Sequence, residues 1–362
     1  MVLINKEIQK IKIAITSICT LRCLHCRVDK TLNIKPTIKD CYKAIDLFLN
    51  SPGRFKRLEV YGGEPFIEFE NLKKITSYAK RKAKKKKIKL TLQIATNATL
   101  INNKIIEWLK RNKEIIIAVS FNGTLKSQQA IRRFPDGKSS YKIVKENIKR
   151  IVKSIGQNRV VAIYCVDPIF AKDAFRDFKE IIKTGIRIVA IECAHGRGWN
   201  EERYLEFEKN IKDINHYILT QAKKDIFIFH EKFIELLRLK GKKVPECPFY
   251  FDLEMYPDGN LGFYPYPFVN YASLKDKIKI GSIKEGIYEK YKKCTYHPQK
   301  CNLCIRNYYT IAELYDGSIA YHKIRESEID NLFYTIVRNS KKDKVLKFYL
   351  TKLTEVLKGF YK

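Results

Sequence analysis

The sequence lacks any apolar run long enough to cross a membrane. Its longest apolar stretches, such as Ile115 to Phe121, have the length of a β-strand. The N-terminal region carries Lys6, Glu7 and Lys10 and has no apolar segment followed by a small-residue cleavage site, so no signal peptide is predicted. These absences predict a cytoplasmic location and no membrane partner.

Acidic residues are scarce beside basic ones. There are 39 Asp and Glu against 71 Lys and Arg, which gives a formal net charge of +32. A field of this sign attracts polyanions, so nucleic acid stays among the candidate partners. The densest basic run, residues 80–87, falls where a predicted helix ends, and lysines suit the last turn of a helix. We favour a solvated helix face over a phosphate-binding patch there, because a charge run carries no sequence readout.

The composition is that of a globular protein able to bury a large core. Of 362 residues, 45% are hydrophobic and 30% charged, and we find no internal repeat. The chain also has 10 cysteines. In a reducing compartment, cysteines in this number indicate metal or redox chemistry rather than disulfides.

Residues 1–200 alternate short β-branched runs with amphipathic helical patterns. The predicted strands are Ile11–Thr16, Arg57–Tyr61, Leu90–Ala95, Ile115–Ser120, Val160–Cys165 and Ile186–Glu192. The predicted helices are Ile38–Asn50, Asn71–Lys86, Asn103–Arg111, Tyr141–Ser154 and Phe170–Thr184. This alternation predicts an α/β fold with a parallel sheet. Six strands are too few for a closed eight-stranded barrel, which leaves a doubly wound sheet or, as we expect, a partial (β/α)6 TIM-like barrel.

The unusual residues follow the predicted strands. The cysteine-rich segment follows the first strand, and the segment from Gly62 to Pro65 follows the second. Thr96 and Asn97 end the third strand, and Asn122 follows the fourth. Because the carboxyl ends of parallel barrel strands share one rim, we expect these segments to converge there.

The C-terminal part predicts three further regions. Residues 201–244 read as two helices that form a bridge. Residues 245–330 are richer in Pro, Gly and aromatics, as in a small second domain, and contain Cys247, Cys294, Cys301 and Cys304. Residues 331–362 predict an amphipathic helix that packs on the body.

Three cysteines, Cys19, Cys23 and Cys26, share one short segment. Three thiolates can hold three corners of a cubane iron–sulfur cluster and leave one iron open. The alternatives are a zinc knuckle or three unconnected cysteines. Structural zinc sites have four ligands, and no fourth one lies nearby in the sequence, so we favour a cluster.

Together, the cysteine segment, the Gly-Gly-Glu-Pro segment and the polar strand ends resemble the radical S-adenosylmethionine (SAM) enzymes over residues 10–200. The resemblance implies that the three cysteines hold a [4Fe–4S] cluster whose open iron is chelated by SAM. It places His25 near the adenine. It also assigns Gly62, Gly63 and Glu64 to the SAM amino group, and glycines let the backbone approach a ligand closely.

Further motifs resemble the branch of this family that modifies peptides and proteins. The segment from Thr96 and Asn97 to Leu100 resembles its Thr-Asn-Gly-Thr-Leu run, and that from Ser120 to Gly123 its Ser-Leu-Asp-Gly run, which binds the SAM ribose. Here Asn122 replaces the aspartate and loses its charge. Arg132 matches the arginine that holds the SAM carboxylate, although an ordinary surface arginine is an equal alternative. Gln128 and Gln129 stand where the branch often has histidine and aspartate.

The C-terminal cysteines resemble a reduced SPASM/Twitch extension, which carries auxiliary iron–sulfur clusters. Cys247, Cys294, Cys301 and Cys304 are enough for one second [4Fe–4S] cluster or for a zinc ion, and we favour the cluster. No cysteine lies between Asn260 and Tyr264, where the Cys-Asp pair of sulfatase maturases is expected. This departure argues against sulfatase maturation.

The resemblance therefore implies an enzyme that cleaves SAM reductively and abstracts hydrogen from a peptide or protein side chain. It implies an electron donor such as flavodoxin or ferredoxin. Because the cysteine segment begins near residue 19, we expect no N-terminal leader-binding domain, so a separate leader-binding partner or a non-peptide substrate is required. Two alternatives stay open: a radical SAM enzyme acting on RNA or a small metabolite, and a non-catalytic zinc-binding interaction protein.

The remaining candidates receive simpler interpretations. Cys41 is expected to be a buried residue of the first helix. Cys165 and Cys193 end two strands, where core packing is favoured over a hydrogen-donor role. His195 lies in a loop, and we favour a turn residue over a SAM or substrate contact.

Overall fold

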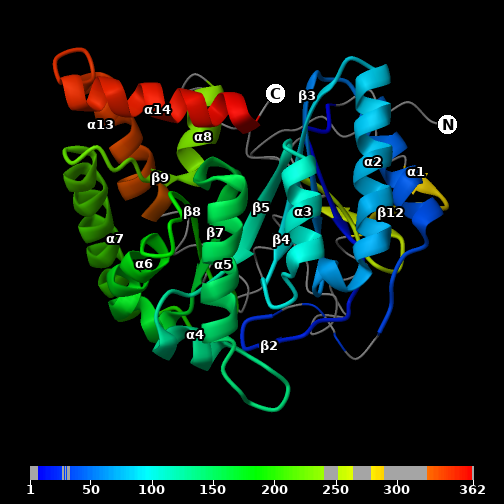
Figure 1. Cartoon of the computed structure of the whole chain (residues 1–362), viewed down its shortest axis with the longest axis horizontal. Helices are drawn as coiled ribbons and strands as arrows, with labels where there is room; N and C mark the ends of the chain where they lie inside the picture. Colours follow the sequence, from blue (N-terminus) through cyan, green and yellow to red (C-terminus); the bar gives the residue numbers. More distant parts are fainter. Residues whose placement is uncertain are drawn as a thin grey trace.

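The computed structural model describes residues 7–26, 28, 30, 33–239, 252–263, 279–288 and 324–360 (Figure 1). Its central strands are β1 (Lys10–Ala14), β3 (Phe55–Tyr61), β4 (Lys89–Thr96), β5 (Ile115–Ser120), β7 (Val160–Val166) and β8 (Ile188–Cys193). The helices between them are α1 (Ile38–Asn50), α2 (Phe69–Lys85), α3 (Asn103–Arg111), α4 (Leu125–Ile131), α5 (Tyr141–Ile155) and α6 (Ala174–Ile182). Each predicted strand end lies within two residues of the observed one.

The sheet is parallel through its middle. Its strand order is β13-β12-β11-β10-β1-β3-β4-β5-β7-β8-β9, and every pair from β10 to β9 is parallel. Within the part of the chain that the structure describes, the two edge strands do not pair with each other, so the barrel is open. The prediction of an α/β fold with a partial (β/α)6 TIM-like barrel is confirmed.

Local sequence explains where the helices begin. The Thr37 hydroxyl accepts a hydrogen bond from the backbone of Asp40 at 3.1 Å, and the Asn102 side chain accepts one from Ile105 at 3.0 Å. Both residues satisfy backbone N–H groups that a helix start leaves without partners. Each helix then buries one apolar face on the sheet, whose strand β5 is buried along almost its whole length.

Several short elements were not predicted. Strand β2 (Arg22–Cys23) pairs antiparallel with β6 (Arg132–Arg133), and helix α4 lies just before β6. The predicted helix Phe170–Thr184 divides into a 3-10 turn, η3 (Pro168–Asp173), and α6. Another 3-10 turn, η2 (Gln157–Arg159), precedes β7, and η1 (Pro65–Glu68) follows the Gly-Gly-Glu segment. Two-residue strands carry too little periodicity to be found by pattern alone.

The region predicted as a helical bridge contains α7 (Glu201–Ala222), β9 (Phe229–His230) and α8 (Glu231–Arg238). Strand β9 extends the parallel sheet beside β8. On the other edge, β10 (Asp252–Met255) pairs parallel with β1. It continues antiparallel through β11 (Asn260–Phe263), β12 (Lys279–Ser282) and β13 (Gly286–Ile287). The strands described within residues 245–330 thus belong to the same sheet as the barrel.

The amphipathic helix predicted within residues 331–362 is present, and a second, shorter helix that was not predicted precedes it. A π-helical segment, η5 (Arg325–Asp330), leads into α13 (Asn331–Asn339), and α14 (Lys344–Phe360) follows after a break. The break falls at polar residues 340–343, where the apolar periodicity stops. The amphipathic character itself is present, because Leu353 and Phe360 of α14 are buried.

Helix α14 crosses the amino-terminal end of the strands, and Figure 1 shows it (red) at the opposite end of the sheet from β2. The hydroxyl of Tyr349 donates to the carbonyl of Ile228 at 2.6 Å, and the hydroxyl of Thr91 donates to the carbonyl of Phe360. The Phe229 and Tyr349 rings lie 4.9 Å apart. These contacts close the amino-terminal end of the barrel with apolar and aromatic side chains.

No helix in the described ranges is both long and apolar enough to span a membrane. The Lys80–Lys87 run covers the end of α2 and the turn before β4. There, Lys84 and Lys85 are exposed, while Lys82 pairs with Asp46 at 2.9 Å.

Candidate functional site

The three cysteines of the short segment lie after β1, at the carboxyl ends of the strands. Cys23 belongs to β2 and pairs with Arg132 of β6. The backbone of Cys26 donates to the carbonyl of Cys23 at 3.1 Å, and that of Leu24 donates to Ile131 at 2.8 Å. The cysteine segment is therefore held on one side by the chain that follows helix α4.

Three N–H groups point at the sulfur atoms. The backbone of Leu21 and the side-chain amide of Asn97 donate to the Sγ of Cys19 at 3.4 and 3.5 Å. The Arg132 guanidinium donates to the Sγ of Cys23 at 3.7 Å. Burial raises the pKa of Cys19 to about 11 and also raises that of Cys23. As free thiols both are protonated at neutral pH, so binding a metal must release protons.

The donor set fits a cubane cluster. In the described residues, no group of three or more His, Cys, Asp or Glu side chains converges on a single metal ion. A cubane differs, because each thiolate binds its own iron and the sulfur atoms need not converge. Three thiols on one segment, two of them facing N–H donors, suit such a cluster, since hydrogen bonds to sulfur tune its potential.

The Gly62–Glu64 segment, which follows β3, packs tightly on the start of the cysteine segment. The backbone of Gly63 donates to Thr16 at 2.7 Å, and that of Glu64 donates to Ile18 at 2.8 Å. A Cβ on Gly63 would lie 1.9 Å from the Ile18 carbonyl oxygen, and Gly62 has a φ of +134°. Glycine is required here because only a residue without a side chain permits this approach. The close approach is to the protein's own backbone.

The Glu64 carboxylate is fully buried and bridges two strand ends. Its Oε1 accepts from the Thr96 hydroxyl at 2.8 Å and from the Phe66 backbone at 3.2 Å, and its Oε2 accepts from the Asn97 backbone at 2.8 Å. Burial raises the pKa of Glu64 to about 7 against the opposing effect of these donors. Both oxygens are thus used by the protein, and Glu64 shapes the turn that follows β4.

The turn after β4 links back to the cysteines. Besides its contact with Cys19, the Asn97 side chain donates to the Thr20 hydroxyl at 3.0 Å and accepts from the Thr99 backbone at 3.0 Å. The hydroxyls of Thr20 and Thr99 are 2.7 Å apart. Ala98, at the centre of the turn, has a φ of +60°, a left-handed conformation that favours glycine.

Asn122, after β5, uses both ends of its amide. Its Oδ1 accepts from the Arg132 Nε at 2.6 Å, and its Nδ2 donates to the carbonyl of Cys165 at 2.7 Å. The guanidinium can only donate and the carbonyl can only accept, which defines the orientation of the amide. An aspartate would place a second oxygen against the Cys165 carbonyl, so asparagine suits this site.

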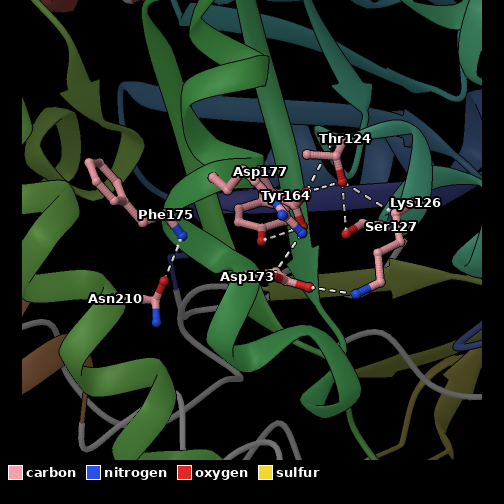
Figure 2. A network of polar contacts seen from close by, with 9 residues as sticks. Thr124, Lys126, Ser127, Tyr164, Asp173, Phe175, Asp177 and Asn210 are labelled. Atoms are coloured by element: carbon pink, nitrogen blue, oxygen red, sulfur yellow. Dashed lines mark hydrogen bonds and ion pairs between the residues drawn. The ribbon is translucent and has the colours of Figure 1, made fainter.

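A buried carboxylate anchors the loop after β5 from the other side (Figure 2). The Asp177 Oδ1 accepts from the backbone and the hydroxyl of Thr124 at 3.0 and 2.6 Å, and its Oδ2 accepts from the Tyr164 hydroxyl at 3.2 Å. A Cβ on Gly123 would lie 2.3 Å from the Asp177 carbonyl oxygen. Burial raises the pKa of Asp177. The loop that carries Asn122 is therefore fastened to α6.

The structure thus connects most of those predicted site residues that it describes. Direct hydrogen bonds join Cys19 to Asn97, Glu64 to Thr96 and Asn97, and Arg132 to both Cys23 and Asn122. His25 lies half-buried in the turn before Cys26, and Ser120 is half-buried at the end of β5. Cys247, Cys294, Cys301 and Cys304 lie outside the described residues.

The other cysteines divide by position. Cys41 of α1 and Cys193 at the end of β8 are buried, as core packing predicted. Cys165 is half-buried at the end of β7, beside Glu192 in the neighbouring strand. His195 is half-buried in the loop after β8.

Sequence reasoning missed Asp177 and the Cys165 carbonyl. Asp177 lies on an amphipathic helix, where an acidic residue is normally predicted to be exposed to solvent. A signal was nevertheless present, because Asp177 falls at a position where the helical period places buried residues. No residue type signals a backbone carbonyl such as that of Cys165.

The sequence model of the Radical SAM superfamily matches residues 13–178. This range begins in β1, contains all three site cysteines and ends in α6. This part of the chain therefore matches the radical SAM superfamily, and the resemblance inferred from the motifs is confirmed.

Solved structures share the fold over most of the chain. The structure of native anSMEcpe with bound AdoMet and Cp18Cys peptide has a TM-score of 0.68 at 16% identity and covers 90% of this chain and 98% of its own. Streptococcus suis SuiB bound to precursor peptide SuiA has a TM-score of 0.56 at 14% identity and covers 82% of this chain and 70% of its own. At these identities the likeness concerns the fold.

One curated relative also matches. It is the uncharacterized protein MJ0907 of Methanocaldococcus jannaschii, 33% identical over 126 residues. The alignment covers 35% of this chain and 42% of that protein.

Proposed function

We propose that this protein is a radical SAM enzyme that abstracts hydrogen from a peptide or protein side chain. When bound, a [4Fe–4S] cluster held by Cys19, Cys23 and Cys26 would supply the electron for reductive cleavage of SAM, which is the chemistry that hydrogen abstraction requires. The observation that carries the proposal is the hydrogen-bonded connection of Cys19 and Cys23 to Asn97, Arg132 and Asn122 at one rim.

In this proposal Cys19, Cys23 and Cys26 hold the cluster. Arg132 is nine-tenths buried, and its Nε and one Nη are engaged with Asn122 and Cys23. A guanidinium has five N–H donors, so others are left to bind the SAM carboxylate. His25 would contact the adenine.

The hydrogen bonds of Glu64 and Asn122 limit how the other predicted residues can contact the SAM amino group and ribose. Gly62 and Gly63 would receive the SAM amino group through their segment, and Glu64 would act by holding that segment against Thr96 and Asn97. Ser120 and Asn122 would face the ribose. Because the Asn122 amide is used by Arg132 and Cys165, its contribution is to shape the ribose site.

The sheet face that points away from the covering helices carries charged residues, unlike the branched apolar filling common in barrels. Strand register aligns Lys12 of β1 with Glu59 of β3 and Gln93 of β4. Arg57 pairs with Glu59 at 2.8 Å and with Glu231 at 2.9 Å. A polar interior suits a substrate with polar backbone groups, and both compared structures have a bound peptide. We therefore favour a peptide.

The rest of the proposal concerns the whole chain. Residues 1–200 would form the radical SAM core, 201–244 a bridge, 245–330 a SPASM/Twitch-like region and 331–362 a helical cover. Cys247, Cys294, Cys301 and Cys304 would hold a second [4Fe–4S] cluster. The protein would act in the cytoplasm and take electrons from a flavodoxin or ferredoxin.

The test is reductive cleavage of SAM. Anaerobically reconstituted protein, reduced with dithionite and given SAM, is expected to form 5′-deoxyadenosine and methionine. Cys23→Ala is expected to lose this activity by at least about a thousandfold while keeping its far-ultraviolet circular dichroism, because one cluster ligand is gone. If C23A forms 5′-deoxyadenosine at the wild-type rate, the cluster assignment is refuted.

Cys41→Ala is the matched control, since Cys41 is buried in α1 away from the rim. Cys41→Ala makes the same substitution as Cys23→Ala and also removes one thiol, but it is expected to keep full activity. Iron content tests the second cluster: wild type should hold about eight irons per chain and C23A about four. A wild-type preparation with zinc and no iron would favour the zinc-binding alternative.

A further inference from the structure

Four buried residues of the rim form a closed ring of hydrogen bonds. The Asn122 backbone donates to the Gln128 Oε1 at 2.9 Å, and the Gln128 Nε2 donates to the Ser140 hydroxyl at 2.9 Å. The Ser140 hydroxyl donates to the Arg132 carbonyl at 2.5 Å, and the Arg132 Nε donates back to the Asn122 Oδ1 at 2.6 Å. Gln128 and Ser140 have no exposed surface.

The ring joins segments that the sequence separates. Asn122 lies after β5, Gln128 on α4, Arg132 on β6 and Ser140 at the start of α5. Through Arg132 the ring also reaches the cysteine segment, because Cys23 pairs with Arg132 in the β2–β6 ladder. Among these residues, Gln128 spans the gap between Asn122 and Ser140.

The chemistry at position 128 is narrowly defined. It requires one acceptor for the Asn122 N–H and one donor for the Ser140 oxygen, because the Ser140 proton is directed to the Arg132 carbonyl. A primary amide supplies both from one flat group. A carboxylate accepts only, and an apolar side chain leaves both partners unsatisfied in a buried place, which is costly.

We propose that Gln128 is a positioning residue that holds Asn122 and Arg132 in their SAM-binding arrangement, through the ring with Ser140. The inference rests on the proposed function for its ligand. It predicts that Gln128, which has no exposed surface, controls the affinity for SAM without touching it. The cause is that Asn122 and Arg132 would otherwise have to be ordered when SAM binds.

The experiment compares three variants of the full-length, reconstituted protein. Gln128→Leu removes the hydrogen bonds to Asn122 and Ser140 and keeps a side chain of similar size. Gln128→His restores one acceptor and one donor when the imidazole is neutral. Gln129→Leu is the matched control, because Gln129 is the next residue of the same helix and is exposed. Each is measured for its SAM dissociation constant by calorimetry, for backbone hydrogen exchange at residues 121–124 without SAM, and for its melting temperature.

We expect Q128L to bind SAM at least about tenfold more weakly and to exchange the Asn122 amide faster, since each of the two lost buried hydrogen bonds is worth up to about that factor. Q129L should stay within about twofold of wild type, and Q128H should recover most of the affinity above the imidazole pKa and lose it below. The loss below that pKa has a specific cause: a protonated ring cannot accept from Asn122.

The inference is overturned if Q128L binds SAM and protects Asn122 as wild type does, or if Q128H and Q128L behave alike while both remain folded. If Q128L fails to fold, Q128H against Q129L decides. Failure of the proposed function looks different: wild type then does not bind SAM, whereas the exchange measurement still reports whether Gln128 holds Asn122.

Discussion

The two ends of the parallel sheet are stabilised in different ways. At the carboxyl end, buried amides, hydroxyls and carboxylates such as Asn97, Glu64 and Asp177 hold the loops by directional hydrogen bonds. At the amino end, α14 covers the strands with buried Leu353, Val356 and the ring of Tyr349. One end is organised by geometry and the other by apolar burial.

The difference follows from what each end must do. Apolar contacts are non-directional and sum to large stabilities, which suits an end that only has to exclude water. Hydrogen bonds contribute less each but define positions, which suits an end that, in the proposed function, presents thiols and donors to a ligand. Barrels commonly divide stability and chemistry between their ends in this way.

The largest expected effect on the free energy of unfolding comes from a substitution that destabilises the amino end alone. Leu353→Ala removes a fully buried side chain from α14 and should lower the free energy of unfolding by about 3 kcal/mol. The SAM dissociation constant should remain at the wild-type value, because no rim residue is touched. Urea unfolding and calorimetry measure the two quantities.

Leu205→Ala is the control for that change. Leu205 on α7 is 52% exposed, so the same truncation should cost less than about 0.5 kcal/mol. A tenfold loss of SAM affinity in L353A would show that the two ends are coupled and would contradict the comparison.

The second effect uses pH to act on the amino end. His230 of β9 is buried, its Nε2 lies 2.9 Å from the Asn215 Oδ1, and burial lowers its pKa from 6.5 to about 3. Below pH 6.5 the unfolded chain takes up a proton that the folded chain refuses, so stability falls as pH falls from 6.5 toward 3. Between pH 7 and 5 the loss should be about 2 kcal/mol.

His230→Gln should lack this part of the acid sensitivity, whereas His216→Gln, at an exposed position of α7, should retain it. The measurement is the free energy of unfolding at pH 5, 6 and 7 for the three proteins. Parallel curves for wild type and H230Q would refute the assignment to His230.

The smallest expected effect on the free energy of unfolding comes from a substitution at the carboxyl end. Ala98 has a φ of +60°, so Ala98→Gly should relieve backbone strain and raise the free energy of unfolding by about 0.5–1 kcal/mol. Ala95→Gly, in β4 and without a positive φ, should instead lower it by a similar amount. Thermal unfolding measures both, and a stability loss in A98G would contradict the strain.

Much of the fold could be predicted because its signals are local. Alternating apolar patterns located six strands of the sheet (β1, β3, β4, β5, β7 and β8) and most helices, and the residues after each strand located the rim. Helix α13 was missed, although a helical apolar period runs on either side of the four-residue break that separates it from α14. Helix α4 was missed because it is too short for its pattern to stand out.

The site was predicted in residue type and only partly in role. The spacing of Cys19, Cys23 and Cys26 indicates a cluster by itself. It does not show that Glu64 is turned wholly into the protein, or that the Asn122 amide is used twice. Those roles depend on partners such as Arg132, which is 109 residues from Cys23 in the chain.

The sequence alone determined the alternation of strands and helices, the order of loops at one rim and the three thiols on one segment. These features depend on periodicity and spacing within short stretches. Only the tertiary structure decided how Gln128 closes a ring with Asn122, Arg132 and Ser140, and how α14 covers the opposite end. The physical reason is that such bonds need atoms from distant segments at hydrogen-bond distance, and packing of the whole chain sets that distance.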